Sequence, residues 1–96
     1  MEFLSLGIIT DAFGLDGTLK IYSTTSKGQL RYKKGATVFL FNPNDNSRTE
    51  LKVLNYRHNG FFDFVKVENI SSKEDALSKK GFEVHVEKRN SDLDKD

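Results

Sequence analysis

The chain has 96 residues and a formal net charge of +1, with 36% hydrophobic and 30% charged residues. Folding buries about 65% of the surface of a chain this long, which allows one globular domain with a modest core. The sequence lacks cysteine, which excludes disulfides and thiolate metal sites, and its near-neutral charge gives no overall attraction to nucleic acid or membrane. Its longest apolar run, Val38–Phe41, has four residues, too few to cross a bilayer.

Alternating apolar and polar side chains predict six short strands. In chain order they are expected at residues 3–12, 18–24, 36–41, 48–58, 61–67 and 82–86. In the first strand, Leu6 and Ile8 share one face with Thr10, so that face is expected to point inward. The polar segment 23–35 has no clear pattern and is left as a connection.

Turn residues separate these strands. Gly14 and Gly17 stand in the first turn, where either can adopt a positive φ. Residues 42–46 contain Pro43 and three asparagines, which are typical of a tight turn. Asn59-Gly60 is the dipeptide of a type I′ turn, so the strands on either side of Gly60 are expected to be antiparallel neighbours.

A short helix is expected before the last strand. Ser71 and Glu74 fit a capping box, the helix would run to about Lys80, and Gly81 suits the position after its end. Six short strands with one helical turn favour an all-β fold, a small antiparallel barrel whose closure removes exposed strand edges.

The residues offer little for catalysis. His58 and His85 are far apart in the chain, and His85 is expected to be a surface residue pointing away from the face of its valine neighbours. Asp11 and Asp16 flank the glycine turn, where aspartates commonly bond to the backbone rather than act as a catalytic pair. No nucleophile, base or metal set converges, so we expect no enzyme and no cofactor.

One stretch of the chain is basic and contains no acidic residue. With Tyr22 and Tyr32 nearby it could hold RNA phosphates and stack on bases, or it could be a solvated loop. Its members, the weak RNA-binding candidates, are Lys20, Lys27, Arg31, Lys33 and Lys34.

Two apolar side chains, Phe13 and Leu15, stand in a turn that requires neither. They either plug the mouth of the barrel or form an exposed patch for a partner.

Three segments in succession resemble the ribosome maturation factor RimM family. The first is a glycine-led strand, turn and strand; the second is an apolar strand that ends in Arg57-His58 and a glycine turn. In the third, Asn69 stands where the family usually has glycine, and asparagine also accepts the left-handed conformation. The three segments are residues 7–21 (GIITDAFGLDGTLKI), 53–60 (VLNYRHNG) and 65–81 (VKVENISSKEDALSKKG).

The resemblance implies a six-stranded barrel of the translation-protein kind and a non-catalytic role in small-subunit maturation and rRNA processing. The implied partners are the free small subunit, protein nineteen of its head, and nearby rRNA, in the cytoplasm and without membrane contact. RimM proteins continue into a PRC-barrel domain that this chain does not contain. Residues 1–86 are therefore interpreted as a monomeric N-terminal domain and residues 87–96 as a linker or tail.

A partner-binding patch is expected where the turns meet. An alternative function is a single-strand RNA-binding barrel of the OB type, which requires aromatic side chains on an exposed sheet face. We expect most phenylalanines in the core instead, because of the strand pattern. The candidate partner-binding residues are Phe13, Leu15, Tyr22, Arg57 and His58.

Overall fold

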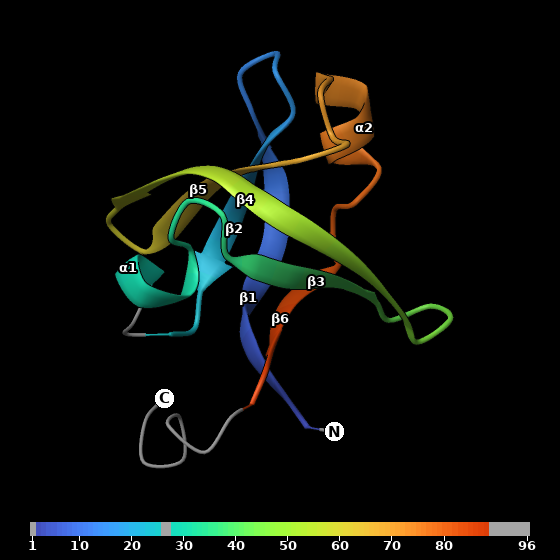
Figure 1. Ribbon diagram of the computed structural model, residues 1–96. Helices are drawn as coiled ribbons and strands as arrows, with labels where there is room; N and C mark the ends of the chain where they lie inside the picture. The colour runs from blue at the N-terminus through green and yellow to red at the C-terminus, as the bar shows by residue number, and fades with distance from the viewer. Residues whose placement is uncertain (1, 26–27, 89–96) are drawn as a thin grey trace.

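The computed structural model describes residues 2–25 and 28–88, which form a closed barrel in the strand order β1-β2-β5-β4-β3-β6 (Figure 1). All neighbouring strands are antiparallel. The strands are β1 (Phe3–Phe13), β2 (Thr18–Ser23), β3 (Thr37–Asn42), β4 (Ser47–Asn59), β5 (Phe62–Val67) and β6 (Glu83–Glu87). The predicted antiparallel barrel is confirmed, and the expected strand ends are at most one residue away from these.

Two short helices accompany the barrel. The sequence did not predict α1 (Gly28–Arg31), which lies in the polar connection between β2 and β3. The helix α2 (Lys73–Leu77) precedes β6, as expected. Figure 1 shows α2 beside the β1–β2 turn and α1 at the opposite end of the barrel. Among the described residues, no helix is long and apolar enough to span a membrane.

The core consists mainly of aliphatic side chains from the inward positions of all six strands, together with Tyr32. None of the eight phenylalanines is fully buried, so the expectation that most belong to the core is wrong. In β5, Asp63, Val65 and Val67 point inward, and Phe62 and Phe64 therefore lie outside. The small barrel fills its interior with branched aliphatic residues and leaves the larger rings on the outward positions.

Two register shifts change the predicted face of β1. They lie between Ser5 and Gly7 against β6, and between Ile9 and Asp11 against β2. As a result Leu6 and Ile9 are buried while Ile8 is 43% exposed. The predicted alternation of one inward face along the whole strand is therefore wrong, because each bulge inserts a residue and reverses the side that follows.

The cap of α2 is one residue later than predicted. Ser72, not Ser71, is the N-cap, and its hydroxyl oxygen accepts a hydrogen bond from the Asp75 backbone N–H at 3.1 Å. The helix ends at Leu77 rather than near Lys80 because the following residues form tighter turns with i→i+3 bonds. Gly81 then has φ +91° and donates its N–H to the Ile9 carbonyl at 2.8 Å.

His85 is buried, which contradicts its expected place at the surface. Its side chain does point to the outside of the barrel, but neighbouring side chains cover it. Phe41 stacks on the ring with centroids 4.8 Å apart, and Arg48 Nε donates to His85 Nδ1 at 3.1 Å. Because a guanidinium can only donate, the ring proton of neutral His85 is on Nε2, 2.9 Å from a Glu83 carboxylate oxygen.

Candidate partner-binding face

Aromatic and basic side chains gather on the outside of four adjacent strands, β1, β2, β5 and β4. Strand pairing places Phe64 between Lys20 and Arg57, and sets Tyr22 opposite Phe62. We call this surface the outer aromatic face; it consists of Phe13, Lys20, Tyr22, Arg57, Phe62 and Phe64.

Ring and cation contacts join the members of the outer aromatic face. The rings of Phe13 and Phe64 have centroids 4.7 Å apart, and those of Tyr22 and Phe62 are 6.0 Å apart in an edge-on arrangement. Lys20 Nζ lies 4.4 Å from the Phe62 ring centroid, and Arg57 Cζ lies 5.5 Å from that of Phe13. These distances are in the range of cation–π contacts, which hold the cations beside the rings and leave their charge available.

A groove of about 560 Å³ runs beside the β1–β2 turn at one end of this face. Phe13 is 45% exposed and Leu15 is 80% exposed, so these side chains do not plug the barrel mouth. Both line the groove together with Phe64 and Arg57. The lining also contains Lys66 and Asp16, so the groove joins three apolar side chains to two cations and one carboxylate, a composition found at protein-binding surfaces.

The turn that carries Phe13 and Leu15 is fixed by its glycines and by Asp16. Gly14 has φ +75° and Gly17 has φ +87°, as the sequence predicted for this turn. Asp16 Oδ1 accepts hydrogen bonds from the Thr18 hydroxyl at 2.7 Å and from the Thr18 N–H at 3.0 Å. These two bonds, the hydroxyl bond foremost, lower the pKa of Asp16, and they confirm its role as a turn residue.

The structure brings together only part of the predicted partner-binding patch. Phe13, Leu15 and Arg57 line one groove, and Tyr22 lies farther along the same face. His58 is turned away from it: its Nδ1 lies 2.8 Å from Oδ1 of buried Asp63, to which it donates. His58 thus belongs to a different pocket.

The basic stretch is divided among several elements. Lys20 lies on β2 in the outer aromatic face, Arg31 is in α1, and Lys33 and Lys34 are exposed in the turn after α1. Lys27 lies outside the described residues. Since α1 is at the other end of the barrel from the Phe13 turn, the described members of this stretch do not form one continuous basic patch (Figure 1).

Sequence reasoning missed Phe62 and Phe64, the centre of the outer aromatic face. The charged residues of β5 gave opposite signals, because Lys66 shares the side of the two rings while Asp63 shares the side of Val65 and Val67. Lysine and aspartate are both rarely buried, so the sequence left the outward side of β5 ambiguous.

The fold and the site together define a small closed β-barrel with an exposed aromatic and basic face. Residues 4–91 match the family model described as the RimM N-terminal domain. The chain is 32% identical over 95 residues to the ribosome maturation factor RimM of Streptococcus uberis. This alignment covers 98% of the chain and 55% of the relative. The corresponding protein of Streptococcus suis is 30% identical over 90 residues, or 94% of this chain and 52% of the relative.

A solved structure shares the fold. It is a crystal structure from Pseudomonas aeruginosa described as a 16S ribosomal RNA processing protein, RimM. It superimposes with a TM-score of 0.74 at 20% identity, over 91% of this chain and 51% of that one. The chain belongs to the RimM family, and it spans about half the length of the curated relatives it matches.

Proposed function

We propose that this barrel is the N-terminal part of a ribosome assembly factor that binds a protein of the small-subunit head. Family membership and the names of the relatives, which are ribosome maturation factors, support the ribosomal role. In this proposal the barrel assists small-subunit maturation and rRNA processing in the cytoplasm through binding, without catalysis or a cofactor.

The observation that carries the proposal is the outer aromatic face. Exposed rings that pack on one another present a large apolar area at little cost in side-chain entropy, and such rings commonly dominate binding energy. Ribosomal proteins are commonly basic, so Lys20 and Arg57 would repel such a partner. Contact would therefore pass through the rings, above all at the groove beside Phe13, while the two cations meet rRNA or acidic side chains.

A second candidate function is direct binding of single-stranded RNA. Rings beside lysine and arginine on an exposed sheet are the features that single-strand binders use to stack bases and hold phosphates. The outward position of Phe62 and Phe64 supports this alternative more strongly than the sequence pattern did. The two functions differ in salt dependence, because phosphate contacts release counterions and apolar protein contacts do not.

The test is calorimetric titration of the chain with purified protein nineteen of the small-subunit series. We expect Phe13→Ser to weaken binding by about 1–3 kcal/mol, which is the loss typical of an apolar anchor. Phe61→Ser is the matched control, since Phe61 is 74% exposed in the β4–β5 turn at the opposite end of the face. Lys33→Ala serves as a second control, and both controls should bind like the unchanged chain.

Melting curves of each variant show whether the barrel survives the change. Unchanged affinity in folded Phe13→Ser would contradict the proposal. A lower affinity of Lys33→Ala, together with RNA binding that weakens steeply as salt is added, would favour the RNA-binding alternative.

A further inference from the structure

One inward position of β5 carries a carboxylate where an apolar side chain would be expected. Asp63 is fully buried, and the next two inward positions hold Val65 and Val67. Removing a carboxylate from water is costly unless hydrogen-bond donors or a cation compensate it. A valine would suit the core better, so Asp63 calls for an explanation other than packing.

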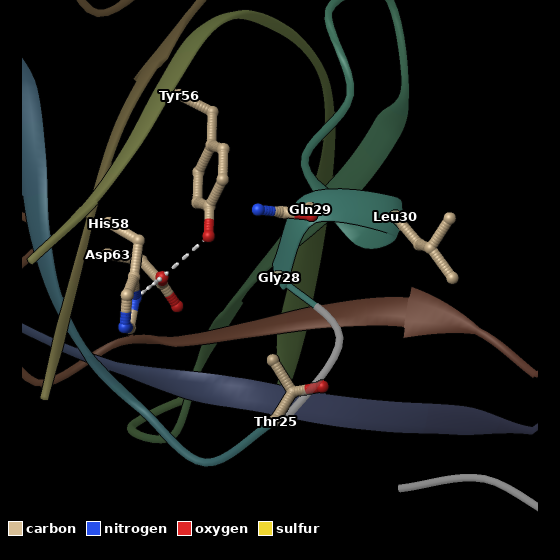
Figure 2. Close-up of a pocket in the computed structure, with 7 residues that line it drawn as sticks. All are labelled: Thr25, Gly28, Gln29, Leu30, Tyr56, His58 and Asp63. Atoms are coloured by element: carbon tan, nitrogen blue, oxygen red, sulfur yellow. Dashed lines mark hydrogen bonds and ion pairs between the residues drawn. The ribbon is translucent and has the colours of Figure 1, made fainter.

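The two oxygens of this carboxylate have different surroundings. Oδ1 accepts from the Tyr56 hydroxyl at 3.1 Å and lies 2.8 Å from His58 Nδ1, as the dashed lines in Figure 2 show. Oδ2 is buried and accepts from no group in the described part of the chain. Buried polar atoms nearly always have a partner, so Asp63 retains one acceptor for a ligand.

A pocket of about 480 Å³ lies beside Asp63, a size common among ligand sites. Figure 2 shows Tyr56, His58 and Asp63 on one side of it and α1, with Gln29 and Leu30, on the other. The side chain of His58 is 49% exposed, which places the mouth of the pocket at the surface.

Gly28 allows α1 to approach the carboxylate. A Cβ atom at this position would lie 2.5 Å from the Tyr56 hydroxyl oxygen and 3.3 Å from Asp63 Oδ1. Any larger residue would push into the hydrogen-bonded group. Glycine at position 28 therefore allows α1 to lie close to the Asp63 carboxylate.

The charge of the described lining favours a cation. Its lining contains one carboxylate and, among the described residues, neither lysine nor arginine. An RNA phosphate would be repelled by Asp63, whereas a guanidinium could donate to its unpaired oxygen. The Tyr56 ring offers apolar surface to the methylene groups of a long basic side chain, and a planar guanidinium also stacks on an aromatic ring.

We propose that this pocket receives an arginine side chain of a protein partner, whose guanidinium donates to Asp63 Oδ2. The pocket lies on the inward side of β5, and the outer aromatic face lies on its outward side. The inference therefore goes beyond the proposed function and does not depend on the outer face: it adds a separate chemical requirement, an exposed arginine on the partner.

The first test uses N-acetyl-arginine amide as the probe, titrated into the ¹⁵N-labelled chain. We expect saturable shifts of the amide signals of residues 28–30 and 56–63. N-acetyl-citrulline amide is the matched neutral probe, with nearly the same shape and no charge, and it should produce no saturable change. Equal responses to the two probes, or no saturation with arginine, would overturn the proposal.

Substitutions at Asp63 give the second test. Asp63→Asn keeps the shape and removes the charge, and should weaken arginine binding at least about tenfold, because a charge-assisted bond is replaced by a neutral one. Asp63→Val removes both carboxylate oxygens and should no longer respond to arginine, and its melting curve shows whether the barrel survives the change. Glu50→Gln, at an exposed carboxylate of β4, is the control that leaves binding unchanged.

Unaltered arginine affinity in folded Asp63→Asn or Asp63→Val would rule out the pocket as the arginine site. Phe13→Ser should keep the arginine response, so failure at the outer aromatic face and failure at this pocket are distinguishable.

Discussion

At the scale of single residues, two glycines of one turn have similar backbone angles and different surroundings. Both Gly14 and Gly17 have positive φ, which strains any other residue. A Cβ at Gly17 would lie 2.5 Å from the Ile70 carbonyl oxygen, whereas a Cβ at Gly14 would meet nothing within 4 Å. Gly17 is therefore needed both for its conformation and for close packing of the turn against the chain before α2.

This difference leads to a prediction for matched alanine variants. Gly14→Ala should lower the free energy of unfolding by about 1 kcal/mol, the cost of a left-handed non-glycine residue. Gly17→Ala should lower it by more than about 2 kcal/mol, because the clash adds to the same strain. Urea denaturation of the two variants measures the difference. Equal losses would show that the close approach to Ile70 has no energetic weight.

The tyrosine phenols near Asp63 make stability sensitive to alkali. Burial first, and then the Asp63 carboxylate, raise the pKa of Tyr56 to about 12; the same two causes raise the pKa of Tyr32 well above its usual value. The unfolded chain releases these protons near pH 10. The stabilisation is thus fully present below pH 10 and is lost as pH rises toward 12.

We expect Tyr56→Phe to lose less stability than the unchanged chain between pH 9 and 11. The phenylalanine variant has one fewer phenol whose ionisation favours unfolding, and all other titrating groups are common to both chains. Denaturant titrations at both pH values measure the two losses. A loss as large in the variant as in the unchanged chain would contradict the raised pKa of Tyr56.

At the scale of elements, local sequence patterns predict the strands but not the bulges. Alternation and turn residues predict each strand end closely, and Asn69 adopts φ +68° at the position where the family usually has glycine. The register shifts of β1 depend on pairing with β2 and β6 at once, which no local pattern encodes. The four-residue α1 was missed because it begins with Gly28, a weak helix former.

The N-cap of α2 is Ser72 in the structure, whereas the sequence pattern predicted Ser71. Ser72→Ala should lower the free energy of unfolding by about 1 kcal/mol, because it removes the acceptor for the Asp75 N–H. Ser71→Ala, the matched control at the position that the sequence favoured, should have little effect. Thermal melts of the two variants decide between them, and a larger loss in Ser71→Ala would contradict the observed cap.

At the scale of the whole molecule, barrel closure assembles the candidate site from distant parts of the chain. The sequence indicated Phe13, Leu15 and Arg57, which stand out as apolar turn residues or as a family motif. It could not show that Phe64 lies between Lys20 and Arg57, since that follows from the pairing of three strands. Nor did it indicate Asp63 as an inward carboxylate, because the faces of β5 were ambiguous until its neighbours were known.

The central claim is that the outer aromatic face binds a protein of the small-subunit head. The most direct measurement is the pattern of amide shifts when the ¹⁵N-labelled chain is titrated with protein nineteen of that series. We expect the largest shifts at residues 13–22, 57 and 62–64, centred on the groove beside Phe13, and small shifts at residues 31–34. Shifts confined to residues 28–34, with the turn at residues 13–17 unchanged, would contradict the claim.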